Sequence, residues 1–172
     1  MSKSSDTRPL ISVIMGVYNS QRTLYEAVKS ILDQSYSNFE FVICDDASTD
    51  DSLKLLDSFN DHRLKILRNK TNKGLAYSLN KCLSVSTGVY VARMDADDMA
   101  YPSRLEKQLS FLEEHKNIDA VGSSVSVWDG RTILGIRNYP EFPSVKHVIK
   151  SNPFAHPTVM LRKKVYEVLG GY

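Results

Sequence analysis

The chain has 172 residues, of which 42% are hydrophobic and 24% are charged, as in an ordinary globular protein. Its formal net charge of +2 is too small to indicate a nucleic-acid-binding protein, and no nucleic-acid partner is expected. No run approaches the 18 apolar residues of a transmembrane helix, and the polar residues 1–9 lack a signal-peptide core, so they are expected to be a disordered lead-in.

The remaining residues, 10–172, are enough for one domain with a real core. The two cysteines, Cys44 and Cys82, lie in apolar surroundings and form no Cys-x-x-Cys motif. They are expected to be buried free thiols in a reducing compartment, which indicates the cytoplasm.

The first half of the chain alternates predicted strands and helices. Residues 10–17 are almost continuously apolar, which is typical of a strand buried on both faces of a parallel sheet. Ser48 and Asp51 resemble an acidic capping box at the start of the second helix. Strands are predicted at residues 10–17, 39–44, 63–67 and 89–94, and helices at residues 24–32, 51–59 and 75–83. This order predicts an α/β fold, a three-layer α/β/α sandwich with a mostly parallel central sheet.

The second half departs from the alternation. Pro102 is placed in the first turn of a helix, and Asp129-Gly130 is a strong hairpin signal, so a β-hairpin elaborates the second half. Gly170 and Gly171 are expected to end the last helix. The predicted elements are a helix over residues 102–112, strands at 118–128 and 132–136, a short helix at 145–149, a strand at 158–161 and a helix at 163–169.

Three carboxylates follow the predicted strand at residues 89–94. Buried carboxylates are costly unless they are paired or metal-bound, so Asp95, Asp97 and Asp98 should lie just beyond the strand. On extended backbone Asp95 and Asp97 point to the same side, and two hard oxygen ligands suit Mg²⁺ or Mn²⁺. The alternatives are an acidic turn that merely ends a strand, and a calcium-binding EF-hand, which Ala100 contradicts at a required glycine position.

Polar clusters follow three predicted strands, at Tyr18-Asn19, Asp45-Asp46 and Asp95 to Asp98. Carboxyl ends of parallel strands share an edge, so the clusters are expected to converge on one pocket. Tyr18 could stack on a base, and Asp46 could accept a hydrogen bond from a base or ribose. No glycine-rich phosphate loop is present, so a metal is expected to hold the phosphates. The competing interpretations are a helix N-terminus charged by Asp45-Asp46 and a simple turn at Tyr18.

The sequence resembles the family-2 glycosyltransferases of the GT-A fold over residues 10–172. The resemblance is carried by many motifs in the same order, at residues 11–19, 30–36, 39–50, 72–74, Asn80, 88–98, 102–105, 156–160 and 170–172. It implies a single GT-A-like domain that binds a nucleotide-sugar.

The resemblance also implies roles for individual residues. Asp46 would hydrogen-bond the base, usually uracil, and Asp95 would face the ribose or sugar. Asp97 and Asp98 would bind the divalent Mn²⁺ or Mg²⁺ on the diphosphate. His156 would lie near the acceptor side. The other donor-binding positions would be Val17, Tyr18, Asn19, Asn72, Gly74 and Arg93. Leu79 stands where the family often has arginine, so Lys73, Arg93 or the metal would carry that charge.

The implied activity is sugar transfer with inversion from a nucleotide-diphosphate donor, expected to be a UDP-sugar, to a hydroxyl acceptor. The acceptor would be a saccharide or lipid-linked saccharide in polysaccharide or glycolipid synthesis, with peripheral association at the inner membrane face.

The family usually places its catalytic base, an acidic pair, beyond the motif that Gly170 opens. The base is therefore expected beyond Tyr172, and the chain is expected to be the donor-binding part of a longer enzyme with weak or absent transfer. The alternatives are a catalytically silent nucleotide-binding domain and a nucleotidyltransferase, which would usually carry a glycine-rich loop after the first strand. A phosphohydrolase would carry its Asp-x-Asp on the first strand rather than the fourth.

Overall fold

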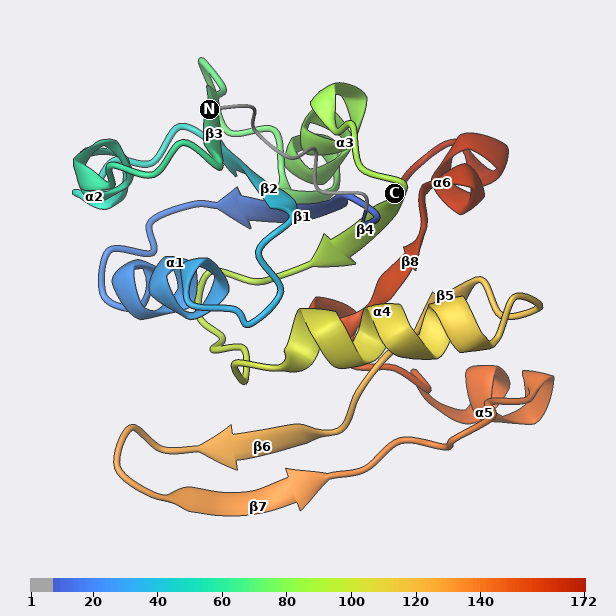
Figure 1. Ribbon diagram of the computed structural model, residues 1–172. Helices are drawn as coiled ribbons and strands as arrows, with labels where there is room; N and C mark the ends of the chain where they lie inside the picture. Colours follow the sequence, from blue (N-terminus) through green and yellow to red (C-terminus); the bar gives the residue numbers. More distant parts are fainter. Residues whose placement is uncertain (1–7) are drawn as a thin grey trace.

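A computed structural model describes residues 8–172 of the protein (Figure 1). Within this range no helix has the length and hydropathy needed to cross a membrane. The strands are β1 (Ile11–Val17), β2 (Phe39–Asp45), β3 (Leu64–Arg68), β4 (Tyr90–Arg93), β5 (Ala120–Val121), β6 (Val125–Trp128), β7 (Ile133–Arg137) and β8 (Met160–Arg162). The helices are α1 (Leu24–Leu32), α2 (Ser52–Ser58), α3 (Leu75–Val85), α4 (Arg104–Glu114), α5 (Val145–Lys150), the 3₁₀ helix η1 (His156–Thr158) and α6 (Lys163–Leu169).

The main sheet has six strands in the order β3-β2-β1-β4-β8-β5. The first four strands are parallel, whereas β8 runs antiparallel to both β4 and β5. Parallel neighbours need crossover connections, and α1, α2 and α3 supply them. The carboxyl ends of β1, β2 and β4 therefore meet at one edge of the sheet.

Helices cover both faces of this sheet (Figure 1). On one face, alternate residues of β1 and β2 pack with the apolar sides of α1, α2 and α4. On the other, Ile14, Val42 and Val91 pack with Leu79 and Cys82 of α3, and Tyr166 of α6 lies against this cluster. Both cysteines are buried free thiols, as the sequence predicts. The three-layer arrangement with a mostly parallel sheet is confirmed.

Four sequence-based boundaries were wrong for local reasons. The strand predicted at residues 89–94 is shorter, because Val89 is 57% exposed and lies before the sheet. The strand predicted at 118–128 is two strands, since the chain leaves the main sheet where Ser123 N–H donates to the Thr158 hydroxyl. Pro102 precedes α4 rather than lying in its first turn. Thr158 ends η1, because its N–H is held by Ala155 O, and β8 begins two residues later.

The predicted hairpin forms a separate two-stranded sheet, β6-β7. Its turn is fixed by Asp129, whose Oδ1 accepts the main-chain N–H groups of Arg131 and Thr132 at 2.8 Å each. Gly130 has a φ of 96°, which favours glycine. The hairpin and α5 lie beyond α4, away from the main sheet (Figure 1).

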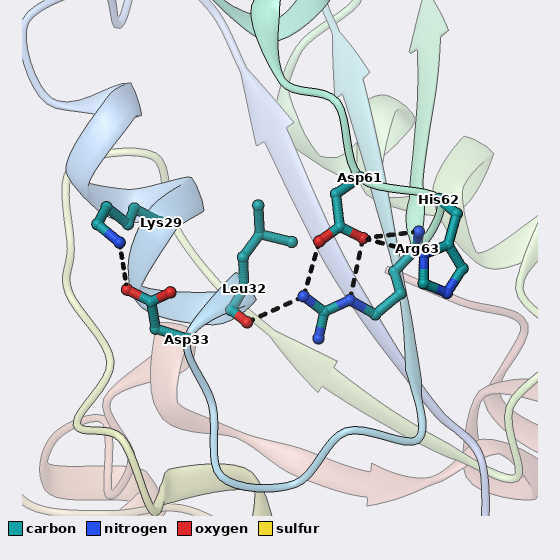
Figure 2. Close-up of polar contacts among 6 residues, drawn as sticks. All are labelled: Lys29, Leu32, Asp33, Asp61, His62 and Arg63. Atoms are coloured by element: carbon teal, nitrogen blue, oxygen red, sulfur yellow. Dashed lines mark hydrogen bonds and ion pairs between the residues drawn. The ribbon is translucent and has the colours of Figure 1, made fainter.

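Arg63 fastens the start of β3 to the end of α1 (Figure 2). Its guanidinium donates to the main-chain O of Leu32 at 3.0 Å and to both carboxylate oxygens of Asp61. The Arg63 hydrogen bond, outweighing burial, lowers the pKa of Asp61 to about 2. The guanidinium also lies 4.4 Å from the ring centroid of Phe39. Two crossover segments are thereby held at one corner of the sheet.

Of the expected lead-in at residues 1–9, residues 1–7 lie outside the described part of the chain. Arg8 donates to the Ser37 hydroxyl at 2.9 Å, and its main-chain O accepts the Asn38 side-chain N–H at 2.7 Å. The main-chain O of Pro9 accepts the Tyr36 hydroxyl. The chain is therefore held by polar contacts before β1 begins.

Glu40 joins neighbouring segments of the sheet near the start of β2. Its carboxylate accepts hydrogen bonds from the Ser12 hydroxyl at 2.6 Å, from Thr87 N–H at 2.6 Å and from Lys65 Nζ. Burial alone would raise the pKa of Glu40, but these donors outweigh it and lower the pKa to about 2. The ionised form is thus part of the folded state.

Replacing Glu40 with glutamine is expected to destabilise the fold most at neutral pH. A carboxyl whose pKa is lower in the folded than in the unfolded state contributes stability above its unfolded pKa and loses it as pH falls through the folded value. A shift from 4.5 to about 2 corresponds to roughly 3 kcal/mol. Urea unfolding at pH 7 and pH 3 should show the gap between wild type and Glu40→Gln narrowing by about half or more. An equal gap at both pH values would contradict this account.

Candidate donor-binding cleft

A cleft of about 450 Å³ opens at the carboxyl edge of the parallel strands. It lies between the loop after β1, the loop after β2 and the turn after β4, with the start of α3 at one side. In an open α/β sheet this edge is where ligands bind. The residues that line it are Gly16, Tyr18, Asn19, Ser20, Gln21, Arg22, Thr23, Asp50, Leu75, Asp95, Ala96 and Asp97.

The loop after β1 presents Tyr18 to the cleft. Tyr18 is 48% exposed, so part of it is accessible to a planar ligand. The next residue, Asn19, has a φ of 50°, a conformation that asparagine tolerates better than most residues. Its N–H donates to the Ser48 hydroxyl at 3.0 Å, and its Oδ1 accepts Thr49 N–H at 2.8 Å. The position of Tyr18 is therefore set by the loop after β2.

A second pair of hydrogen bonds ties the same two loops. Gln21 N–H donates to Asp50 Oδ2 at 3.0 Å, and Asp51 N–H donates to Gln21 Oε1 at 2.9 Å. The predicted capping box was wrong. The Ser48 hydroxyl accepts a hydrogen bond from Asn19 N–H, and the Asp51 side chain makes no capping hydrogen bond to α2. The polar residues after β2 thus brace the cleft wall, and Asp50 Oδ1 also accepts Ser52 N–H at 3.0 Å at the start of α2.

The acidic residues after β4 lie in a turn. Asp98 N–H contacts Asp95 O at 3.4 Å, and the Thr23 hydroxyl donates to Ala96 O at 2.9 Å. The predicted extended backbone was therefore wrong at this point. Asp95 and Asp97 nevertheless both line the cleft, because the turn is held against the residue before α1.

Two arginines stabilise this acidic turn. Arg93 is buried and pairs with Asp95 through Nε and Nη2, at 3.0 to 3.1 Å. Arg104 donates to the main-chain O of Arg93 at 2.7 Å and to Gln108 Oε1 at 3.1 Å. Burial lowers the pKa of Arg104 to about 10, opposed by Asp98 and Asp95, so its charge is retained behind the turn. Positive charge close to the acids offsets part of their mutual repulsion.

The carboxylates of the turn after β4 suit a hard divalent cation whose other coordination positions are filled by a bound ligand and water. Desolvation, followed by the charges of Asp97 and Asp95, raises the pKa of Asp98. A cation beside Asp97 and Asp98 would relieve this repulsion. Within residues 8–172 no three acidic, histidine or cysteine side chains form a ready metal cage. Mg²⁺ is commonly bound by one or two carboxylates together with substrate phosphates and water, and Asp97 with Asp98 fits that pattern.

Asp46 lies at the same edge but does not line the cleft. It is only 3% exposed, and its N–H donates to Val17 O at 2.8 Å. Its carboxylate accepts Asn69 Nδ2 at 2.7 Å, Gly74 N–H at 2.7 Å and Lys73 N–H at 2.9 Å. Burial would raise the pKa of Asp46, but these donors lower it. In this structure Asp46 organises the loop that leads into α3.

The predicted donor residues therefore divide into two groups. Those that line the cleft are Tyr18, Asn19, Asp95 and Asp97. Those outside its lining are Val17, Asp46, Asn72, Gly74, Arg93 and Asp98. Val17 is buried, while Asn72 is exposed and its Oδ1 accepts Gly74 N–H at 3.1 Å. His156 is exposed on η1 and is also outside the lining.

Sequence reasoning missed the polar residues that follow Asn19. Gln21, Arg22, Thr23 and Asp50 all line the cleft. The available signal was their position, because they stand between a predicted strand and helix at the edge that carries the three clusters. Leu79, which stands where the family often has arginine, is buried in the core. The arginine that lines the cleft is Arg22.

Comparisons with known proteins agree on one family. The family described as "Glycosyl transferase family 2" matches residues 12–170. EpsE of Bacillus subtilis is 48% identical over 167 residues, covering 95% of this chain and 60% of the relative. WfgD of Escherichia coli is 31% identical over 152 residues, covering 88% of this chain and 60% of the relative. It is named a UDP-Glc:α-D-GlcNAc-diphosphoundecaprenol β-1,3-glucosyltransferase. The chain thus spans about 60% of the length of these relatives.

A solved structure of S. aureus TarS, residues 1–349 in complex with UDP-GlcNAc, matches with a TM-score of 0.77 and 26% identity. The match covers 93% of this chain and 47% of that one. The neighbour confirms the expected GT-A architecture.

Replacing Asp46 with asparagine is expected to loosen the loop before α3. An amide nitrogen would then face donors that now bond a carboxylate, and losing such charge-assisted bonds typically costs about 1–3 kcal/mol. Hydrogen exchange at the N–H groups of Lys73 and Gly74 should accelerate by roughly tenfold or more. The control is Asp57→Asn, which removes an exposed carboxylate paired with Arg68. Unchanged exchange at both positions would show that Asp46 does not organise this loop.

Proposed function

Because the chain belongs to glycosyl transferase family 2, we propose that its cleft binds the nucleotide-diphosphate sugar of a glycosyl transfer reaction. The observation that carries this proposal is the convergence of Tyr18 and the acidic pair Asp95 and Asp97 on one cleft. An aromatic ring suits a base, and acidic residues suit a metal-bound diphosphate and sugar hydroxyls. We propose a UDP-sugar as donor, by analogy with the UDP-GlcNAc complex of TarS.

The base side of the donor would lie at the β1 and β2 loops. We propose that Tyr18 stacks on the base while Val17 and Asn19 shape the backbone around it. Asp46 would hydrogen-bond the base, next to the loop before α3 that carries Asn72 and Gly74. Gly74 has a φ of 88°, so this entry into α3 favours glycine.

The diphosphate side would lie at the turn after β4. Asp97 and Asp98 would hold Mn²⁺ or Mg²⁺, which supplies charge neutralisation for the departing diphosphate when bound. Asp95, oriented by Arg93, would face the ribose or sugar. Arg22, on the cleft wall after β1, would supply a cation, because Leu79 in α3 replaces the arginine that the family often has there.

The proposal for the acceptor side rests on membership of the family. Inversion requires a general base that takes the proton of the acceptor hydroxyl on the face opposite the diphosphate. His156 is exposed on η1, and we propose it only as an acceptor-side residue. By analogy with WfgD, the acceptor would be a lipid-linked saccharide, used in polysaccharide or glycolipid synthesis at the inner membrane face.

Peripheral membrane association is supported by the surface of the hairpin and α5. The segment from β6 to α5 carries many exposed apolar side chains and also the exposed basic residues Arg131, Arg137, Lys146 and Lys150, a combination that favours an anionic lipid surface. The exposed apolar residues are Val127, Trp128, Ile133, Leu134, Ile136, Phe142, Val145, Val148 and Ile149.

The donor proposal predicts metal-dependent nucleotide binding. Titration of UDP in the calorimeter should give heat in the presence of Mn²⁺, and Asp97→Asn should weaken that binding by about tenfold, since roughly 1.4 kcal/mol of metal attraction would be lost. The matched control is Asp33→Asn. Asp33 follows the end of α1 that is away from the cleft, and its carboxylate pairs with exposed Lys29 (Figure 2). No Mn²⁺-dependent heat with UDP or another nucleotide would defeat the proposal.

The membrane proposal predicts binding to anionic vesicles. The chain should co-sediment with phosphatidylglycerol vesicles and less with phosphatidylcholine vesicles, because the basic side chains favour anionic lipid. Ile149→Ser on α5 should reduce the bound fraction about twofold or more, since an exposed apolar contact is removed. Leu169→Ser removes an equally exposed apolar side chain on α6, across the sheet, and should change nothing. Equal effects of the two variants would contradict a specific role of the hairpin and α5 surface in membrane binding.

A further inference from the structure

The last residues of the chain are fixed to the middle of α3. Tyr172 N–H donates to Asn80 Oδ1 at 2.8 Å, and Asn80 Nδ2 donates to the main-chain O of Tyr172 at 3.2 Å. These paired bonds join positions 92 residues apart in sequence. One asparagine amide therefore holds both polar groups of the Tyr172 backbone.

The approach depends on the two glycines before Tyr172. Gly170 ends α6 in the left-handed region with a φ of 83°, and Gly171 follows with a φ of 102°. A Cβ on Gly171 would overlap Asn80 Oδ1. Both the backbone conformation and the close contact require glycine, so the segment is shaped to meet Asn80.

The Tyr172 side chain faces the other way, toward Arg93. Arg93 Cζ lies 5.9 Å from the centroid of the Tyr172 ring, within the range of a cation–π contact. The Tyr172 hydroxyl bonds to that of Tyr166, and the two ring centroids are 5.1 Å apart. Desolvation raises the pKa of Tyr172 and of Tyr166, so both remain neutral hydroxyls at physiological pH.

Arg93 connects this segment to the cleft. Its guanidinium is nearly buried and grips both oxygens of Asp95, whose side chain lines the cleft. A flexible arginine keeps one geometry only when its surroundings restrict its rotamers. Asp95 restricts it from one side and the Tyr172 ring from another.

We infer that Asn80 and Tyr172 are positioning residues for the donor site: Asn80 fixes Tyr172, Tyr172 confines Arg93, and Arg93 sets the orientation of Asp95. The role of Asp95 toward the sugar rests on the proposed function, whereas the chain of contacts from Asn80 to Arg93 does not. Neither Asn80 nor Tyr172 lines the cleft, so both act through Arg93.

The test uses two readouts on the 172-residue chain. The first is the Arg93 Nε–Hε resonance in ¹⁵N NMR, which reports the Arg93–Asp95 pair without any ligand. The second is the Kd for UDP with Mn²⁺. Asn80→Ala and Tyr172→Ala should shift or broaden the resonance and raise the Kd about fivefold, the factor expected when a contact of cation–π strength is lost.

Conservative and control variants separate positioning from general stability. Tyr172→Phe keeps the ring but loses the hydroxyl bond to Tyr166, so it should retain the wild-type Arg93 resonance and Kd. Ser84→Ala, exposed on α3, and Tyr77→Ala, an exposed tyrosine of the same helix, should leave both readouts unchanged. If Asn80→Ala fails to fold, the contrast between Tyr172→Ala and Tyr172→Phe decides the question.

An Arg93 resonance that is unchanged in the folded Asn80→Ala and Tyr172→Ala variants would overturn the inference. So would a Tyr172→Phe variant that behaves like Tyr172→Ala, because the ring would then not be the part that confines Arg93. Absence of UDP binding by the wild type would overturn the proposed donor role instead, while the NMR comparison would still decide whether Asn80 positions Arg93.

Discussion

The hydrogen bonds that join the loops at the carboxyl edge of the sheet are the constraint on which the cleft depends. Parallel pairing of β1 with β2 and β4 delivers three polar loops to one place. Buried polar groups must find partners, and here they find each other. Asn19 binds the loop after β2, Thr23 binds the turn after β4, and Asp46 binds the loop before α3. The same bonds that satisfy the backbone therefore fix the shape of the cleft.

Carboxylates have different uses at the two ends of the sheet. Near the start of β2, Glu40 is enclosed by donors from neighbouring segments and stabilises the fold. At the carboxyl edge, Asp46 is similarly enclosed, whereas Asp97 and the Arg93-paired Asp95 both line the cleft. Enclosed acids hold the scaffold, and acids open to the cleft suit a cation and its ligand.

Sequence patterns predicted the scaffold well for a physical reason. Continuous apolar runs such as β1 and periodic apolar faces such as α1 are local, and burial enforces them over many residues. The common edge for Tyr18 and Asp97 followed from the parallel order. The shape of the loops did not, because the Asn19–Thr49 and Thr23–Ala96 bonds span 30 and 73 residues. The enclosure of Asp46 by hydrogen-bond donors and the position of Arg22 in the cleft could not be predicted from the sequence for the same reason.

The central claim is that one ligand-binding cleft joins Tyr18 to the acidic turn at Asp97, and paramagnetic broadening by Mn²⁺ tests it most directly. In ¹⁵N spectra recorded with UDP, low Mn²⁺ should broaden the amide signals around Asp97, Tyr18 and Asp50, because all three line the cleft. Signals near Glu40, towards the amino ends of the parallel strands, should stay sharp. Broadening centred elsewhere, or equal with and without UDP, would contradict the account.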